Sequence, residues 1–204
     1  MATLRRTRVL ATALLLAVLP GCSEDKESPP PIGPSSTPTS AHTSTVHPTE
    51  AEHASRAVDA KIREFYAVLS RLRQDTRQDL GRLESVAIST ELTAQRQFVR
   101  QEHRKGRRQV GETKIANLAI QSVNLDSSDP KSGKVPAVLV DVCWDVSDVD
   151  VVDKEGNSVV SPDRPDTGWT RHIVANFNWS EDPEGGWRVA SGEDLKKMPC
   201  SPVS

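Results

Sequence analysis

The chain has 204 residues, of which 36% are hydrophobic, 4% aromatic and 26% charged, enough for one ordinary domain with some unfolded sequence. These values exclude a large multidomain enzyme. The formal net charge is −2, and without the first 21 residues, which carry three arginines and no acid, 23 basic residues stand against 28 acidic ones. A balance of −5 argues against nucleic acid as a partner. The sequence has no run of 18 or more apolar residues, so it predicts no helix that spans a bilayer.

The first residues have the layout of an export signal. Three arginines, an apolar stretch over residues 9–19 and a small Gly21 come before Cys22. This order resembles the bacterial lipoprotein signal, in which the cysteine thiol receives a diacylglycerol with palmitate-type acyl chains and the cysteine becomes the new N-terminus after cleavage. The resemblance predicts that lipidated Cys22 anchors the protein to the extracytoplasmic face of the cell membrane. The alternatives are an ordinary signal peptide with an incidental cysteine, and a segment that is not cleaved.

The composition changes after Cys22 and divides the chain into three parts. Six prolines are mixed with serine and threonine, and residues 23–49 contain almost no large apolar side chain. Such a stretch cannot form a core and predicts a disordered, semi-stiff tether, with a proline-rich docking motif as the alternative. His42, His47 and His53 in or beside it are interpreted as solvated rather than metal-binding. The predicted parts are a signal peptide at 1–21, a tether at 22–49 and a folded domain at 50–204.

Helices are expected in the first half of the folded domain. Thr49 can cap a helix, and Glu52 can reach back to it. Apolar residues then recur every three or four positions and predict one buried stripe, whereas the intervening basic residues, including Arg71 and Arg73, are expected to face outward. The stripe consists of Val58, Ile62, Phe65, Tyr66, Leu69 and Leu72. Two further short helices are predicted, the last ending near Gly106.

From about residue 108 the apolar period changes to two, which predicts strands. They are expected at 108–125, 135–147, 158–160, 169–179 and 187–190, with a hairpin turn at 153–157. In the second strand, one face is apolar and the other carries Asp141, Cys143 and Asp145. Helices followed by strands predict an α+β fold, with N-terminal helices packed on an antiparallel sheet.

Several motifs carry a resemblance to a known fold. These are Val-Asp-Val-Cys-Trp-Asp at 140–145, Asp-Lys-Glu-Gly at 153–156 and Gly-Gly-Trp-Arg-Val at 185–189, together with the order of elements. With these motifs, the domain resembles the nuclear transport factor 2-like superfamily and, more narrowly, secreted lipoproteins of high-GC Gram-positive bacteria. The resemblance implies a curved, cone-like α+β domain, of a kind that often pairs as a homodimer through the sheet. It says little about function, because the superfamily includes isomerases, dehydratases, cyclases and noncatalytic modules.

The two remaining cysteines are expected to form a disulfide bond. Outside the membrane the compartment is oxidising, and Cys143 and Cys200 are an even pair once Cys22 carries lipid. The alternative is two thiols that never meet. Their spacing is unlike that of a redox motif.

A catalytic set is hard to assemble from this sequence. An isomerase or cyclase would need an aspartate or histidine base with a tyrosine or acid partner inside the domain. Tyr66 is interpreted as a core residue with a bonded hydroxyl, and His172 as a strand residue on the solvent face. Asp141 and Asp145 are expected on the sheet face away from Tyr66. No catalytic residue, cofactor or metal site is therefore predicted.

Two charged clusters can each be interpreted either as ordinary surface structure or as a binding site. The acidic residues around the 153–157 turn are favoured as a solvated hairpin over a calcium site, because the glycine does not fit an EF-hand. Basic residues between 100 and 108 suit a helix C-terminus, with an anionic lipid or wall polymer as the alternative partner.

The function predicted from the sequence is a noncatalytic, lipid-anchored cell-envelope module. Its expected partner is an envelope protein or a small apolar ligand, and Tyr66 and Trp144 are the candidates for a ligand pocket. The alternative is an isomerase- or cyclase-like enzyme acting on a small apolar substrate. A cavity of several hundred cubic ångströms with buried polar groups would favour that alternative. The four tryptophans are otherwise expected in the core.

Overall fold

The computed structural model describes residues 47–197, 200 and 201. The predicted signal peptide, Cys22 and nearly all of the tether lie outside the described residues. The described residues belong to one folded unit, in which helices pack on an antiparallel sheet. This confirms the predicted α+β class, whereas the cone shape implied by the resemblance stays a prediction.

Helix α1 (Glu50–Gln74) begins at the predicted cap. The backbone N–H of Thr49 donates to Glu52 Oε2 at 2.7 Å, and the Glu52 N–H donates to Thr49 Oγ1 at 3.3 Å. Two donors that the first helical turn leaves unpaired are thus satisfied. The predicted apolar stripe of α1 is buried in the core, apart from Tyr66, which is half-buried.

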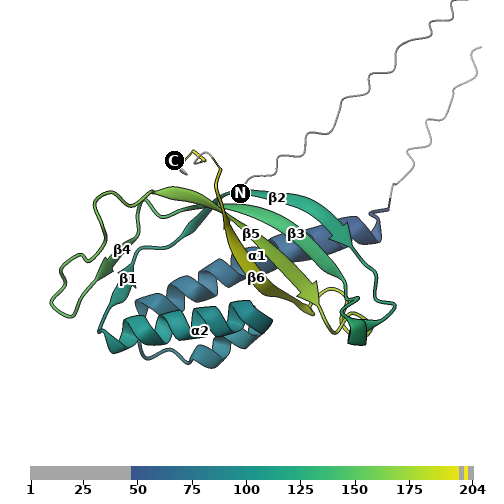
Figure 1. Ribbon diagram of the computed structural model, residues 1–204, viewed down its shortest axis with the longest axis horizontal. Helices are drawn as coiled ribbons and strands as arrows, with labels where there is room; N and C mark the ends of the chain where they lie inside the picture. The colour runs from purple at the N-terminus through teal and green to yellow at the C-terminus, as the bar shows by residue number, and fades with distance from the viewer. Residues whose placement is uncertain (1–46, 198–199, 202–204) are drawn as a thin grey trace, which may run out of the picture. The chain divides into compact units, whose positions relative to one another are not determined.

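The two shorter helical segments differ in kind. Leu80–Ser85 is a 3-10 helix, η1, whereas Ser89–Arg104 forms the regular helix α2. Gly106, with φ 73°, ends this region close to the predicted position. Figure 1 shows α1 and α2 on the same side of the main sheet.

The main sheet has four antiparallel strands in the order β2-β3-β5-β6. They are β2 (Lys114–Asn124), β3 (Ala137–Asp145), β5 (Thr167–Asn176) and β6 (Trp187–Leu195), and a short 3-10 helix, η2 (Pro130–Ser132), lies between β2 and β3. Register shifts interrupt the β2–β3 and β5–β6 pairings. Such bulges bend a sheet, and Figure 1 shows the strands curving over the helices.

A separate two-stranded ribbon pairs β1 (Arg108–Val110) with β4 (Asp150–Val152). The prediction of one strand over 108–125 was therefore wrong, because the chain turns away at Gly111 before β2 starts. Gly111 has φ 79°, and a side chain there would overlap the Asp148 carbonyl. Only glycine combines this backbone angle with so close an approach.

Other strand boundaries also differ from the prediction. Strand β5 starts and ends earlier than expected, and β6 continues five residues beyond Ala190. The segment 158–160 is no full strand: Ser158 forms a single bridge with Val152, and the Val159 N–H donates to the Val151 carbonyl.

The two faces of β3 are divided as predicted. Val138, Val140 and Val142 are fully buried against the helices, and the opposite face carries Asp141 and Cys143. The C-terminal segment packs on that opposite face. There Cys143 is bonded to Cys200, with a Cα–Cα distance of 6.3 Å, as expected from the sequence.

Candidate ligand-binding cavity

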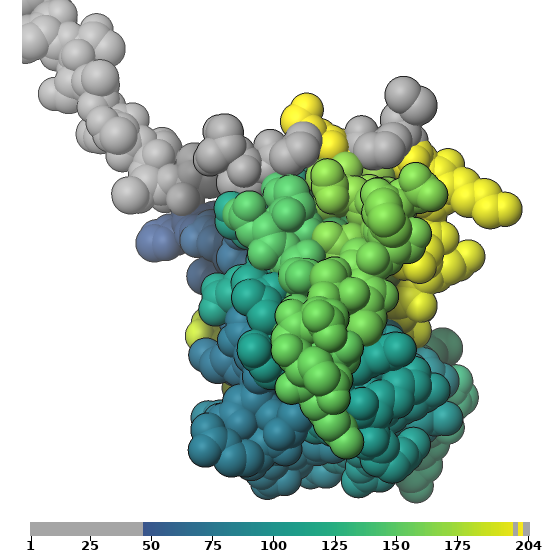
Figure 2. Space-filling model, turned by 90° about the vertical axis from the view of Figure 1, so that its left-hand side faces the viewer, coloured from purple at the N-terminus to yellow at the C-terminus, as the bar shows by residue number. Residues whose placement is uncertain are grey.

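A cavity of about 570 Å³ opens between the helices and the inner face of the sheet. Residues from α1, α2, β1, β3, β4, β5 and β6 line it. Figure 2 shows the segment around β4, in light green, lying over this end of the folded unit. The helices and the sheet thus do not fill the space between them with side chains.

Most of the cavity wall is apolar. The apolar side chains come from both helices, the end of β3 and the segment around β4. They are Phe65, Leu69, Phe98, Val99, Trp144, Val146, Val149 and Val151. A wall of this kind binds an apolar molecule by removing its surface from water.

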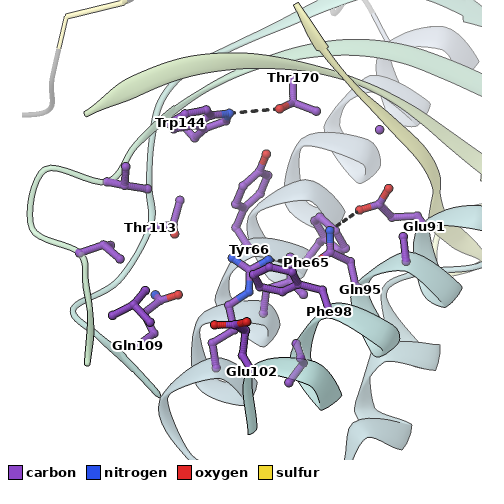
Figure 3. Close-up of a pocket in the computed structure, with 18 of the residues that line it drawn as sticks. Phe65, Tyr66, Glu91, Gln95, Phe98, Glu102, Gln109, Thr113, Trp144 and Thr170 are labelled. Atoms are coloured by element: carbon purple, nitrogen blue, oxygen red, sulfur yellow. Dashed lines mark hydrogen bonds between the residues drawn. The ribbon is translucent and has the colours of Figure 1, made fainter. Parts of the chain in front are cut away.

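Trp144 marks the sheet side of the cavity, as Figure 3 shows. Its cross-strand partner is Gly168, and a side chain at Gly168 would overlap the indole. The glycine therefore allows the ring to lie against the backbone of β5. In that position Trp144 Nε1 donates to Thr170 Oγ1 at 3.1 Å, and Thr170 Oγ1 donates to Asp194 Oδ1 at 2.8 Å.

The other tryptophans lie elsewhere. Trp187 is fully buried and contacts Trp179 edge-to-face in the core, as expected. Trp169 lies on the opposite face of the sheet, where Lys197 sits 4.9 Å from its ring centroid. Among the tryptophans, Trp144 thus lines the cavity.

Tyr66 projects from α1 toward the sheet (Figure 3). Its hydroxyl contacts His172 there. Its hydroxyl lies 3.1 Å from His172 Nε2, while His172 Nδ1 lies 3.3 Å from the Ser191 carbonyl oxygen. A carbonyl only accepts, so Nδ1 carries the proton and Nε2 accepts from the Tyr66 hydroxyl. The predicted bonded hydroxyl of Tyr66 is confirmed, and the side chain also lines the cavity together with Trp144.

The prediction that His172 faces solvent was wrong. Its side chain is on the inner face of β5 and is 2% exposed. Burial lowers the pKa of His172 to about 4, so the ring is neutral near pH 7. Burial also raises the pKa of the Tyr66 hydroxyl above its ordinary value. The pair is therefore uncharged.

A third polar group comes from α2 and the end of α1. Glu91 Oε1 accepts from Gln95 Nε2 at 2.8 Å, and Gln95 Oε1 accepts from Arg73 Nη2 at 2.8 Å. Burial raises the pKa of Glu91 and lowers that of Arg73. The expectation that Arg73 faces outward was wrong: it lines the cavity, with its guanidinium carbon 5.0 Å from the centroid of the Phe98 ring.

The predicted carboxylates of β3 lie apart from this cavity. Asp141, on the outer face, accepts from Arg171 Nε at 2.6 Å and also pairs with Lys197. The hydrogen bond from Arg171 holds the pKa of Asp141 below its usual value. As expected, Asp141 is not brought together with Tyr66. Asp145 caps a turn by accepting from the Ser147 N–H at 2.8 Å.

The charged clusters serve local contacts. In the acidic hairpin, Asp148 pairs with Lys114 at 2.6 Å, and Asp153 accepts from the Asn157 N–H at 2.8 Å. Within residues 47–197, 200 and 201, no three histidine, cysteine or carboxylate side chains are placed to hold a metal ion. Of the basic cluster, Arg107 and Arg108 line the cavity, whereas Arg100 and Arg104 border a separate hollow along α2.

Comparisons with known proteins add little to this geometry. No family model matches the chain, and no curated protein does. A solved structure of the intermembrane space region of the chloroplast protein ARC6 is similar at 16% identity, with a TM-score of 0.47. The match covers 69% of this chain and 95% of that one. Among the described residues, neither α1 nor any other helix combines the length and the apolar character that a bilayer-spanning segment requires.

Proposed function

We propose that this protein is a noncatalytic, membrane-tethered module that binds a small amphipathic molecule in the cavity between its helices and its sheet. The cavity itself is the observation that carries the proposal. Its volume of about 570 Å³ lies within the range common for sites of small organic ligands. Its wall combines a larger apolar area with many polar and charged side chains, which suits a molecule that has both kinds of surface.

The tether is the second component of the proposal and rests on the sequence. The basic start, the apolar stretch and Gly21-Cys22 favour a lipid on Cys22, and the proline-rich segment favours a spacer between membrane and domain. The motifs quoted above likewise support kinship with secreted lipoproteins that carry a nuclear transport factor 2-like domain. A protein so anchored would hold its ligand at the outer membrane surface.

An isomerase- or cyclase-like enzyme is the second candidate, because one specific observation favours it. Two groups with displaced pKa values, His172 and Glu91, lie on the wall of the same cavity as Tyr66. Against this reading, the lone pair of His172 Nε2 already accepts from Tyr66, and Nδ1 is held by a backbone carbonyl. In this arrangement neither ring nitrogen of His172 is free to act as the base that such a reaction needs.

Filling the cavity tests the binding proposal. Ala94 lines the cavity from α2, whereas Ala67 is exposed on α1 and does not line it. In the chain without residues 1–22, we expect Ala94→Trp to weaken binding of an environment-sensitive amphipathic fluorophore by about tenfold or more, because the indole occupies ligand space. Ala67→Trp, the matched control, should bind like the parent.

Two results would contradict the proposal. One is saturable binding that Ala94→Trp leaves unchanged, which would place the probe elsewhere on the surface. The other is the absence of binding by the parent chain. Turnover of a model enone or ketone that His172→Gln abolishes would instead favour the enzyme.

A further inference from the structure

Arg73 is a half-buried cation on the cavity wall whose buried Nε has no partner, and it bears on the identity of the ligand. We propose that the molecule bound in the cavity carries a carboxylate, and that Arg73 receives it. This inference rests on the proposed function, since it names the chemical class of the ligand for the same cavity.

Arg73 is poorly satisfied in the structure. Of its five N–H donors, Nη2 donates to Gln95, a neutral amide, and the buried Nε has no partner. Its guanidinium carbon lies 5.0 Å from the centroid of the Phe98 ring, and this cation–π contact uses none of the N–H donors as a hydrogen bond. Within the described residues, Arg73 makes no salt bridge.

The nearby carboxylates do not fill this role. Glu91 reaches Arg73 only through Gln95, and its burial disfavours the ionised form. Glu102 pairs with Lys105 at 2.7 Å and Arg107 at 3.5 Å, and Asp194 accepts from Thr170. A cation that is partly removed from water without a paired anion carries a desolvation cost, which an anionic ligand would offset.

Arg164 provides a useful contrast. Its Nε is also buried without a partner, but its Nη2 donates to the carbonyls of Val146 and Val149, both at 2.8 Å. Arg164 therefore ties the loop after β3, whereas Arg73 has no such backbone role. Of the other cavity-lining arginines, Arg107 pairs with Glu102 and Arg108 is exposed. Arg73 is therefore the enclosed cation that remains for a ligand.

A carboxylate matches what Arg73 offers. Two carboxylate oxygens can accept from adjacent N–H groups of a guanidinium in a bidentate pair. The rest of such a ligand would then lie along Phe65, Leu69 and Val99, which line the same cavity. The expected class is an apolar monocarboxylate, such as a fatty or aromatic acid.

A matched pair of probes tests the charge without altering the protein. Dansylaminoundecanoic acid and its methyl ester share the fluorophore and the chain and differ in the anionic group. With the chain lacking residues 1–22, we expect the acid to bind about 10- to 100-fold more tightly than the ester, the range for a hydrogen bond to a charged group. Equal affinities, or a tighter ester, would overturn the inference but leave the proposed function standing. If neither probe binds, the carboxylate inference and the proposed function are both contradicted.

Variants then assign the effect to Arg73. Arg73→Gln should weaken binding of the acid by a similar factor and binding of the ester by less than about twofold, because only the charged contact is lost. Arg71→Gln, an exposed arginine two residues away, is the matched control and should change neither. Arg73→Lys keeps the positive charge but loses the planar set of guanidinium N–H donors. Its affinity for the acid should therefore lie between those of the parent and Arg73→Gln. Unchanged acid binding by a folded Arg73→Gln protein would overturn the assignment.

Competition separates a carboxylate from other anions. Dodecanoate should displace the dansylated acid, while dodecanol should do so far less well. Dodecyl phosphate displacing it more strongly than dodecanoate would overturn the carboxylate and point to a phosphate ligand.

Discussion

His172 shows how one buried side chain can link pH to the stability of the cavity wall. The ring contacts Tyr66 and Phe65 and donates to the Ser191 carbonyl. It also lies beside Gly192, as does the Glu91 carboxylate. A side chain at Gly192 would lie 3.0 Å from the imidazole and 3.1 Å from Glu91 Oε2, so the glycine makes room for both. Protonating His172 here would place a charge in a largely apolar wall.

We predict that His172 makes the fold acid-sensitive. Its pKa is about 4 in the folded protein, against an ordinary value of 6.5, so between these values the unfolded chain binds more protons. The free energy of unfolding should therefore fall as pH falls through that window, by up to about 3 kcal/mol from this group. Denaturant titrations at pH 7 and pH 4 should show a smaller loss for His172→Gln than for the parent.

Glu91 acts in the opposite direction, which makes the comparison of variants necessary. Its raised pKa means that the folded protein binds a proton where the unfolded chain is still ionised, so its contribution to stability grows as pH falls. The parent and His172→Gln both contain Glu91, so the difference between their stability–pH profiles isolates the contribution of His172. Parallel profiles would show that His172 titrates as it does in the unfolded chain. Exposed His53→Gln serves as the control.

The misplacement of His172 and Arg73 has a physical cause. Strand β5 carries large apolar residues on both faces, Trp169 and Ile173 outside and Val174 inside, so alternation could not tell which face is buried. Arg73 follows the buried Leu72 at the end of α1, where a basic residue usually suits the helix dipole. Only the position of α2 shows that this arginine is enclosed.

At the level of elements, the sequence predicted a helix or strand correctly where its structure depends on residues within that element. The capping box starts α1, and the apolar stripe fixes its buried face. The division of β1 from β2 depends instead on how closely Gly111 approaches Asp148, which is a tertiary contact. The polar end of β6 likewise forms a strand because it pairs with β5, although its residues resemble a loop.

The C-terminal segment is attached to the outer face of the sheet, and its bridge gives a prediction. Cys143 and Cys200 are 57 positions apart, a closure that the loop-entropy model values at about 4 kcal/mol. Cys200→Ser should lower the free energy of unfolding by roughly that amount, measured with denaturant, and reduced parent protein should match it. Probe affinity should be unchanged, because the bridge lies on the face of β3 opposite the valines that pack inward.

Thiol labelling supplies the decisive control for the bridge. Under denaturing, nonreducing conditions, the chain without residues 1–22 should show no reactive thiol at these two positions. Two reactive thiols, or identical unfolding of oxidised parent and Cys200→Ser, would contradict the bond.

At the level of the whole molecule, the candidate site is assembled from distant parts. Tyr66, Glu91, Trp144, His172 and Asp194 come from five elements and share no sequence motif. The sequence therefore identified Tyr66 and Trp144 as pocket candidates but could not join them to the others. Whether space remained between helices and sheet depended on packing, which composition does not determine.

The proposed tether gives a prediction for the full chain in a bacterial host. A palmitate analogue should label the protein, and the protein should fractionate with membranes, because acyl chains bury their methylenes in the bilayer. Cys22→Ala should lose both properties, while Cys200→Ser, the control, should keep the label. An unlabelled parent found free in the medium would contradict the anchor.

The strand order has a consequence for how the domain can form during synthesis. Each strand of the main sheet pairs with the sheet strand that precedes it along the chain, since β4 pairs separately with β1. Hydrogen bonding can thus advance from the N-terminal side as each new segment becomes available, without waiting for a remote partner. Cys200 follows β6 along the chain, so its bond to Cys143 can form only after every strand of the main sheet has been synthesised.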